Sequence, residues 1–460
     1  MRVRPFYTWA LFVSSALVAM ACRPTNQTDR DAATRAWSDV ETIARAPGEE
    51  DRYPAVVMNA GGDGLLSWLR GGALWARPYD GAHQRWGTAV MVAPVARAAS
   101  PRVGIDGQGN SVLLWARDDT EEDQGIWSSR GTNHGSDWSS PVRLRAGKAL
   151  GPQLAVSAGG TALAAWTERS DGNVLTVASC DFRAGAWNPV VNIPRPGADS
   201  GDRNPRVAVD GGGGGFLIWE QPDSPNGVSS VWTERYDGSW VFSSVAALET
   251  FTGDDAYAPS LALNESGVGM AVWLQLGANG AAGGPQIWGR AYDSGAWKDA
   301  AVIGSSPLIE WDPPPDVAID PAGSAVAIWS EVLPSNPEFY NVRAARHRTD
   351  ARTWGAPRFL ETTNLISSDL TEYASPRVGI DGAGDTLAVW RRVTAAAGVQ
   401  VYTSRLSASA TDWMPENGEA LHHAATQSTL TLDLAVSRNG TALAAWYDGA
   451  AFELRTSIYR

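Results

Sequence analysis

Cysteine, histidine and methionine are scarce in this chain of 460 residues, which contains 2, 5 and 6 of them. A zinc or similar metal site needs His, Cys, Asp or Glu residues at characteristic spacings. The histidines do not show such a spacing: His83, His134, His347, His422 and His423. We therefore expect no metal and no cofactor.

Basic runs are also missing, and the formal net charge is −13. A negatively charged surface repels phosphate backbones and anionic lipid headgroups. The sequence contains no stretch of Lys and Arg interleaved with aromatic residues, which would favour nucleic acid. We expect no nucleic-acid partner, and membrane contact only through a lipid anchor.

Long hydrophobic runs are limited to residues 10–20, which are too few to span a bilayer as a helix. Arg2 and Arg4 precede this run and Ala21 follows it, as in an export signal covering residues 1–21. Residues 19–22, which end in Cys22, resemble the lipobox of bacterial lipoproteins, although Ala19 stands where Leu is usual. This resemblance implies a lipidated Cys22, a tether over residues 22–35 and a place in the bacterial cell envelope, at the outer membrane or cell surface. Plain secretion is the alternative.

A lipidated Cys22 would leave Cys180 without a partner, so no intrachain disulfide is expected and stability must come from packing. Tryptophan is correspondingly abundant, with 22 residues, beside 48 glycines and 27 prolines. Many short strands joined by tight turns are typical of such a composition.

One pattern recurs eight times: a proline, a short aliphatic strand, an Asp-like residue, a glycine three places later and a tryptophan six residues after that. The last copy has Leu432 in place of the proline. The copies cover residues 53–68, 100–115, 151–166, 204–219, 258–273, 314–329, 375–390 and 431–446. A repeat near fifty residues that fills the chain predicts one closed array rather than several domains.

Each copy predicts four strands. In seven of the eight copies the first strand has a small residue between its aliphatics, such as Gly104, and the first copy has Val57 there; small residues suit strands crowded around an axis. The second ends in the invariant tryptophan, and the fourth begins near another, such as Trp138. The turn after the first strand needs Asp, Asn or Ser for a local hydrogen bond and glycine for a left-handed conformation. Calcium loops are a second interpretation of these Asp and Gly residues, but further carboxylates do not recur at ligand spacing.

The eighth copy lacks a fourth strand, whereas residues 36–43 have the fourth-strand pattern and precede the first copy. We therefore predict an all-β, eight-bladed β-propeller over residues 36–460, with four antiparallel strands per blade and the last blade closed by the N-terminal strand. We also expect it to be a monomer.

Residues 127–142 resemble the Asp-box turn of sialidase-like propellers, with Asn133, Gly135 and Trp138 matching its Asp, Gly and Trp. Gly131 stands where that motif has Ser, and other blades depart further. The motif is structural in that family, so the resemblance implies the fold and says little about hydrolysis.

Two sets of polar residues are predicted to form one mixed-charge ring near the axis. The axial set follows the leading proline (or Leu432) in each copy: Ala55, Arg102, Gln153, Arg206, Ser260, Asp316, Arg377 and Asp433. The post-tryptophan set lies two residues after the second-strand tryptophan: Arg70, Arg117, Glu168, Gln221, Gln275, Glu331, Arg392 and Asp448. As ligand-binding candidates we select Arg102, Glu168, Arg206, Glu331 and Arg377.

Three axial arginines are similar to the carboxylate-binding triad of sialidases, since guanidinium groups bind carboxylates in a bidentate manner. The Tyr and Glu pair that this family uses in catalysis has no counterpart in the sequence, and solvated charges paired across blades are the alternative. A quinone-dependent dehydrogenase is disfavoured by the absence of an adjacent cysteine pair. Gly211–Gly215 extends the turn of the fourth copy and does not precede a helix, so it is not a phosphate loop.

These observations predict a non-catalytic binding or scaffold module for a protein or glycan, with no catalytic residues assigned. Its binding face is expected among the loops that join the fourth strand to the next first strand and the second strand to the third. The alternative is a sialidase-like glycoside hydrolase, which needs a pair of carboxylates or an activated nucleophile. A deep pocket with two carboxylates beside the arginines would favour that alternative.

Overall fold

The structure is a computed structural model, and it describes most of the chain from residue 35 onward. The described residues are 35–43, 51–95, 98–118, 122–168, 174–181, 185–193, 203–222, 227–249, 255–276, 285–305, 314–333, 336–361, 365–366, 375–394, 398–423, 431–448 and 453–460. Contacts separate Met1–Ala36 from Trp37–Arg460, and all the strands belong to the second unit. The predicted signal segment, Cys22 and the tether up to residue 34 lie outside the described residues.

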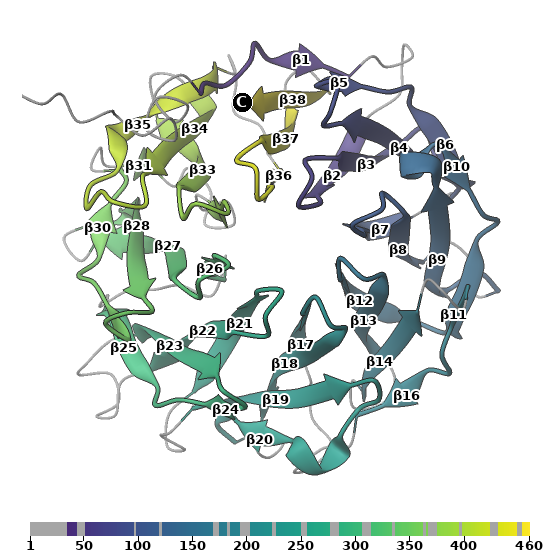
Figure 1. Cartoon of the computed structure of the whole chain (residues 1–460), viewed down its shortest axis with the longest axis horizontal. Helices are drawn as coiled ribbons and strands as arrows, with labels where there is room; N and C mark the ends of the chain where they lie inside the picture. The colour runs from purple at the N-terminus through teal and green to yellow at the C-terminus, as the bar shows by residue number, and fades with distance from the viewer. Residues whose placement is uncertain are drawn as a thin grey trace, which may run out of the picture. The chain divides into compact units, whose positions relative to one another are not determined.

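The described residues of this unit form eight antiparallel sheets, here called blades one to eight in chain order (Figure 1). The inner strands are β2 (Asp51–Met58), β7 (Ala98–Ile105), β12 (Ala149–Val156), β17 (Arg203–Val209), β21 (Ala256–Leu263), β26 (Asp316–Ile319), β32 (Arg377–Ile380) and β36 (Leu432–Val436). The second strands are β3 (Gly64–Arg70), β8 (Ser111–Arg117), β13 (Thr161–Glu168), β18 (Gly214–Pro222), β22 (Gly269–Leu276), β27 (Ala325–Leu333), β33 (Thr386–Thr394) and β37 (Ala442–Asp448). The third strands are β4 (Ala73–Asp80), β9 (Gly125–Thr132), β14 (Val174–Asp181), β19 (Ser229–Asp237), β23 (Pro285–Asp293), β28 (Asn336–Arg348), β34 (Gly398–Leu406) and β38 (Glu453–Tyr459).

The inner strands contact one another in cyclic order, and β36 of blade eight also contacts β2 of blade one. The all-β propeller prediction is confirmed by this arrangement. The described residues contain two short 3-10 helices, η1 (Asn133–Gly135) and η2 (Phe242–Ser244), and none of their helices is long and apolar enough to cross a membrane.

The prediction of four strands in every blade is wrong, because five of the eight sheets contain five or six strands. In those blades the outer strand is broken into separate pieces that pair with the same third strand. The outer strands are β5 (Arg85–Trp86) and β6 (Val90–Pro94), β10 (Asp137–Trp138) and β11 (Val142–Ala146), β15 (Ala186–Trp187) and β16 (Val191–Asn192), β20 (Ala246–Ala247), β24 (Ala296–Trp297) and β25 (Ala301–Ser305), β29 (Thr353–Trp354), β30 (Arg358–Phe359) and β31 (Leu365–Ile366), β35 (Met414–His423) and β1 (Glu41–Thr42). Prolines such as Pro141 and Pro357 lie at the breaks, and proline cannot donate a ladder hydrogen bond.

The last blade is completed by the N-terminal segment, as the sequence predicts. β1 pairs with β38, with Glu41 opposite Thr456, and Trp37 forms a β-bridge to Tyr459. The Ser38 amide donates to the Ile458 carbonyl at 2.7 Å, and Ile43 is 2% exposed. The two ends of the ring are therefore joined by backbone hydrogen bonds and by a buried side chain.

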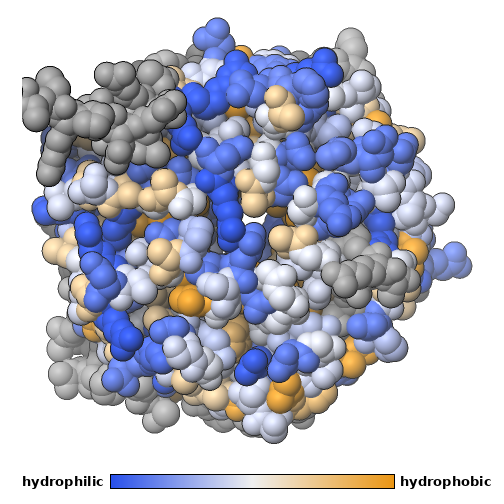
Figure 2. Space-filling view, in the orientation of Figure 1, coloured by the Kyte–Doolittle hydropathy of each residue, from blue (hydrophilic) through white to orange (hydrophobic). Residues whose placement is uncertain are grey.

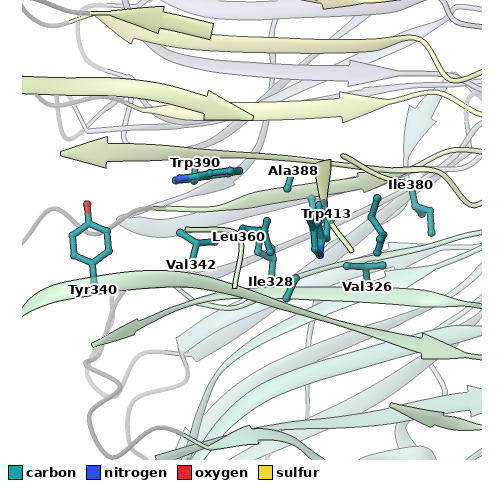
Figure 3. Close-up of a cluster of buried hydrophobic side chains, with 12 residues drawn as sticks. Val326, Ile328, Tyr340, Val342, Leu360, Ile380, Ala388, Trp390 and Trp413 are labelled. Carbon is teal, nitrogen blue, oxygen red and sulfur yellow. The ribbon is translucent and has the colours of Figure 1, made fainter. Parts of the chain in front are cut away.

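The core lies between neighbouring blades. The eight second-strand tryptophans are each 3% exposed or less: Trp68, Trp115, Trp166, Trp219, Trp273, Trp329, Trp390 and Trp446. In Figure 3, Trp390 and Ala388 of β33 face Val326 and Ile328 of β27 across one such interface. Burial of one tryptophan removes roughly 150–250 Å² from water, which contributes about 4–6 kcal/mol at most.

The small residues in the inner strands are required by crowding. A Cβ atom added to Gly104 would lie 2.2 Å from Cγ2 of Val156 in the next blade, and one added to Gly379 would lie 2.3 Å from Cγ2 of Val436. The turn glycines all have positive φ, from 82° to 96°, and in one such turn the Asp106 carboxylate accepts the Asn110 amide at 2.8 Å. The predicted turn chemistry is confirmed by these contacts.

Candidate functional site

A recurring bulge in the inner strands sets the direction of the residues nearest the axis. The residue before the proline has a positive φ in six blades, for example 50° at Ser100 and 51° at Asn204. The register between the first and second strands shifts at this point, as between Ala99 and Arg102. Sequence reasoning missed the bulge, although the proline at a fixed place in each copy was a signal for it.

The axial set lies together at the start of the inner strands. All eight of its residues line one cavity of about 500 Å³, whose volume is in the range of small-molecule sites. Figure 2 shows an opening near the middle of the ring, bordered mostly by hydrophilic residues. Three of the five predicted ligand-binding residues, Arg102, Arg206 and Arg377, are therefore brought together from three different blades.

Each of the three arginines makes the same kind of local contact. Each guanidinium donates to the carbonyl oxygen of its own preceding proline, at 3.3 Å for Arg102, 3.0 Å for Arg206 and 3.1 Å for Arg377. Burial lowers the pKa of Arg102, and the nearby Arg377 lowers it further, whereas Asp433 opposes both effects. A guanidinium has five N–H donors, so a single carbonyl contact leaves Arg102 and Arg377 able to bind a ligand.

Two carboxylates face the same cavity and link neighbouring blades. Asp433 of blade eight accepts the Val56 amide of blade one at 2.9 Å, and Asp316 of blade six accepts the Val378 amide of blade seven at 3.0 Å. Burial raises the pKa of both carboxyls, and Arg377 is the strongest influence that lowers them. The cavity therefore combines three guanidinium groups with two carboxylates that the fold itself orients.

The post-tryptophan set does not line this cavity. Its charged members pair with partners in their own blade or in the preceding blade. The ion pairs are Arg70 with Asp51 at 2.5 Å, Arg117 with Asp123 at 3.1 Å, Glu168 with Arg145 at 2.5 Å, Glu331 with Arg343 at 2.6 Å, Arg392 with Glu361 at 3.5 Å and Asp448 with Arg455 at 3.2 Å.

Glu168 and Glu331 are thus placed away from the three axial arginines, although the sequence groups them with the same site. The two glutamines of the post-tryptophan set have a different role. Gln221 and Gln275 accept the indole N–H of Trp219 and Trp273, each at 3.1 Å. The prediction that both sets form one ring is not what the geometry shows.

The Asp-box-like turn has a structural role here. Asn133 and His134 adopt positive φ values of 50° and 54°, and the Trp138 indole donates to the Gly135 carbonyl at 2.8 Å. Within the described part of the chain, no group of three or more His, Cys, Asp or Glu side chains is placed to hold a metal ion. Most of the predicted binding loops, including residues 194–202 and 367–374, lie outside the described residues.

Neither a family model nor a curated protein matches this sequence. Solved structures with a similar fold include a protein of unknown function from Dyadobacter fermentans, at 13% identity over 81% of this chain and 99% of that chain, with a TM-score of 0.43. A lectin from Burkholderia pseudomallei is 13% identical over 80% of this chain and 99% of that chain, with a TM-score of 0.48. An alpha-L-arabinanase from Penicillium chrysogenum is 12% identical over 92% and 98%, with a TM-score of 0.41. At such identities, ligand and activity have to be argued from this chain's own residues.

Proposed function

We propose that this protein is a lipid-anchored binding module of the bacterial cell envelope that holds an acidic glycan in its axial cavity without cleaving it. The observation that carries the proposal is the convergence of Arg102, Arg206 and Arg377 on one cavity from three separate blades. Guanidinium groups in a partly buried site bind carboxylates strongly, because charge-assisted hydrogen bonds form in bidentate geometry.

The two aspartates favour binding over catalysis. Asp433 accepts the amides of Val56 and Leu434, and Asp316 accepts the amide of Val378, so part of each carboxylate is engaged in holding the ring together. A catalytic acid or base must instead exchange a proton with the substrate. The cavity carries three guanidinium groups against two carboxylates, so a ligand with one negative charge would balance its formal charge.

A glycoside hydrolase is the second candidate, and one observation favours it. Asp316 and Asp433 are two carboxyls with raised pKa values in the same cavity as the arginines. A raised pKa suits a general acid, and a pair of carboxyls is the usual equipment of glycoside hydrolysis. Under this candidate the same cavity would bind and cleave an acidic sugar.

Glycan binding and glycoside turnover, measured on the mature protein, separate the two candidates. We expect an acidic glycan to bind, with affinity at least about tenfold weaker in Arg102→Ala because a charge-assisted contact is lost. Arg117→Ala is the matched control from the same blade, since Arg117 pairs with Asp123 outside the cavity, and it should bind normally. Hydrolysis of a fluorogenic glycoside that disappears in Asp316→Asn or Asp433→Asn would establish the enzyme instead.

The anchor is a separate part of the proposal and has its own test. Labelled palmitate should be incorporated into the protein in bacterial cells, and Cys22→Ser should abolish the label and release the protein from the membrane fraction. Retention of the label in Cys22→Ser would contradict lipidation at this residue.

A further inference from the structure

The axial cavity has two unlike walls. In ring order the axial set runs Ala55, Arg102, Gln153, Arg206, Ser260, Asp316, Arg377 and Asp433. Blades one and five lie opposite each other in the ring, as the positions of β2 and β21 in Figure 1 show, and they contribute the small residues Ala55 and Ser260. These two residues divide the cavity into a cationic wall (Arg102, Gln153 and Arg206) and an acidic wall (Asp316, Arg377 and Asp433).

Each carboxylate has one electrostatic neighbour on its own wall and a weaker one on the cationic wall. Asp433 is influenced first by Arg377 and then by Arg102, which lies beyond Ala55 in the ring. Asp316 is influenced by Arg377 and also by Arg206, which lies beyond Ser260. Arg377 is therefore the shared electrostatic partner of both carboxylates, and it lies between them in the ring order.

The two walls differ in charge and in hydrogen-bonding capacity. With its carboxylates ionised, the acidic wall carries two negative charges and one positive charge, so it repels a second anionic group on a ligand. The cationic wall carries two positive charges around the neutral Gln153 amide, which can donate to an anion from the middle. Arg377 disfavours an ammonium group on the acidic wall, whereas hydroxyl groups can donate to Asp316 and Asp433 there.

We propose that the cavity selects a singly charged acidic sugar that lies across the axis, with its carboxylate on the cationic wall and its hydroxyl groups on the acidic wall. This inference rests on the proposed function and adds to it the charge and orientation of the ligand. Sugars that carry a second anionic group, such as a sulfate, are rejected by Asp316 and Asp433. Neutral sugars and amino sugars lack the group that the cationic wall binds.

Calorimetric titration of the mature protein with four probes tests this selectivity. The probes are methyl glucuronide, its sulfated derivative, methyl glucoside and methyl glucosaminide. We expect methyl glucuronide to bind at least about tenfold more tightly than the sulfated derivative. The sulfate would lie beside the carboxylates of the acidic wall, and like charges placed together in a partly buried site repel strongly. Equal or tighter binding of the sulfated probe would overturn the inference.

The variant Asp316→Asn/Asp433→Asn tests whether the acidic wall is the cause. Asparagine keeps an acceptor oxygen for the Val56 and Val378 amides, and the melting temperature reports whether the ring stays intact. We expect the preference for the singly charged probe to shrink severalfold, and an unchanged preference would contradict the role of the acidic wall. Should the variant not fold, the preference of the unaltered protein among the four probes still decides. Failure of every acidic sugar to bind would contradict the proposed function itself, whereas binding without preference contradicts only this inference.

Discussion

The axial and post-tryptophan sets contain the same kinds of side chain in the same repeat, yet they lie in different surroundings. Arg70, two residues after its tryptophan, is 9% exposed and pairs with Asp51, which is fully buried. Arg102, one residue after its proline, faces a cavity shared by all eight blades. The position of a charged residue along its strand therefore determines its surroundings. A residue near the second-strand tryptophan pairs with a neighbouring strand, whereas a residue after the leading proline faces the axial cavity.

The largest expected effect comes from breaking the ring on which both sets depend. Deletion of residues 36–43 removes β1, Trp37 and the buried Ile43, and leaves β38 with an open edge. We expect a sharply lower melting temperature in calorimetry and loss of ligand binding. Deletion of residues 23–34 is the control and should leave the melt unchanged. A fully cooperative, unshifted melt after deletion of 36–43 would rule out the closure.

Replacement of one arginine from each set tests the comparison directly. Arg70→Met leaves the buried Asp51 carboxylate without its cation, which should destabilise the protein by about 3–5 kcal/mol. Arg102→Met should change stability by about 1 kcal/mol or less, because the residue faces the cavity and not an ion-pair partner within its blade. Urea denaturation measures both, and equal losses would show that the two sets do not differ in this way.

Glu234 extends the comparison to an acid that is buried within a blade and accepts a hydrogen bond from the Ser244 hydroxyl at 3.3 Å. Burial raises the pKa of Glu234 to about 7, from 4.5. The folded state therefore keeps this proton to a higher pH than the unfolded state does, so stability falls as pH rises between about 4.5 and 7. This fall is at most about 1.4 kcal/mol per pH unit.

Glu234→Gln should remove this part of the pH dependence in urea denaturation at a series of pH values. Glu168→Gln is a suitable control, because Glu168 has Arg145 as a cation partner. The same slope in Glu234→Gln and in the unaltered protein would exclude Glu234 as the titrating group.

The smallest effects are expected for the two glutamates that the sequence assigned to ligand binding. Glu168→Gln and Glu331→Gln should leave the affinity for an acidic sugar within about twofold, since neither side chain lines the cavity. Titration calorimetry measures this affinity beside that of Arg206→Ala, which should bind much more weakly. A loss of affinity in Glu168→Gln or Glu331→Gln as large as that in Arg206→Ala would show that the replaced glutamate contributes to ligand binding.

Much of the fold follows from local rules that a sequence displays. The turn glycines and the second-strand tryptophans meet a requirement that repeats in all eight blades, and the small residues such as Gly104 meet one that repeats in seven of them. The fourth-strand pattern at residues 36–43 likewise indicated its partner, because the eighth copy lacked that strand. The outer-strand breaks were missed, since they depend on single residues such as Pro141 that differ from blade to blade.

The candidate site was predicted in part, and the reason for the limit is geometric. The axial position can be predicted from the repeat alone, because the residue after the proline (or Leu432) occupies the same place in every copy. The pairing of the charges depends on the folded ring, since Glu168 pairs with Arg145 of the preceding blade while Arg102, Arg206 and Arg377 line one shared cavity. Contacts across a ring depend on which blades lie adjacent or opposite and on the direction of each side chain. The order of residues along a single strand determines neither of these two properties.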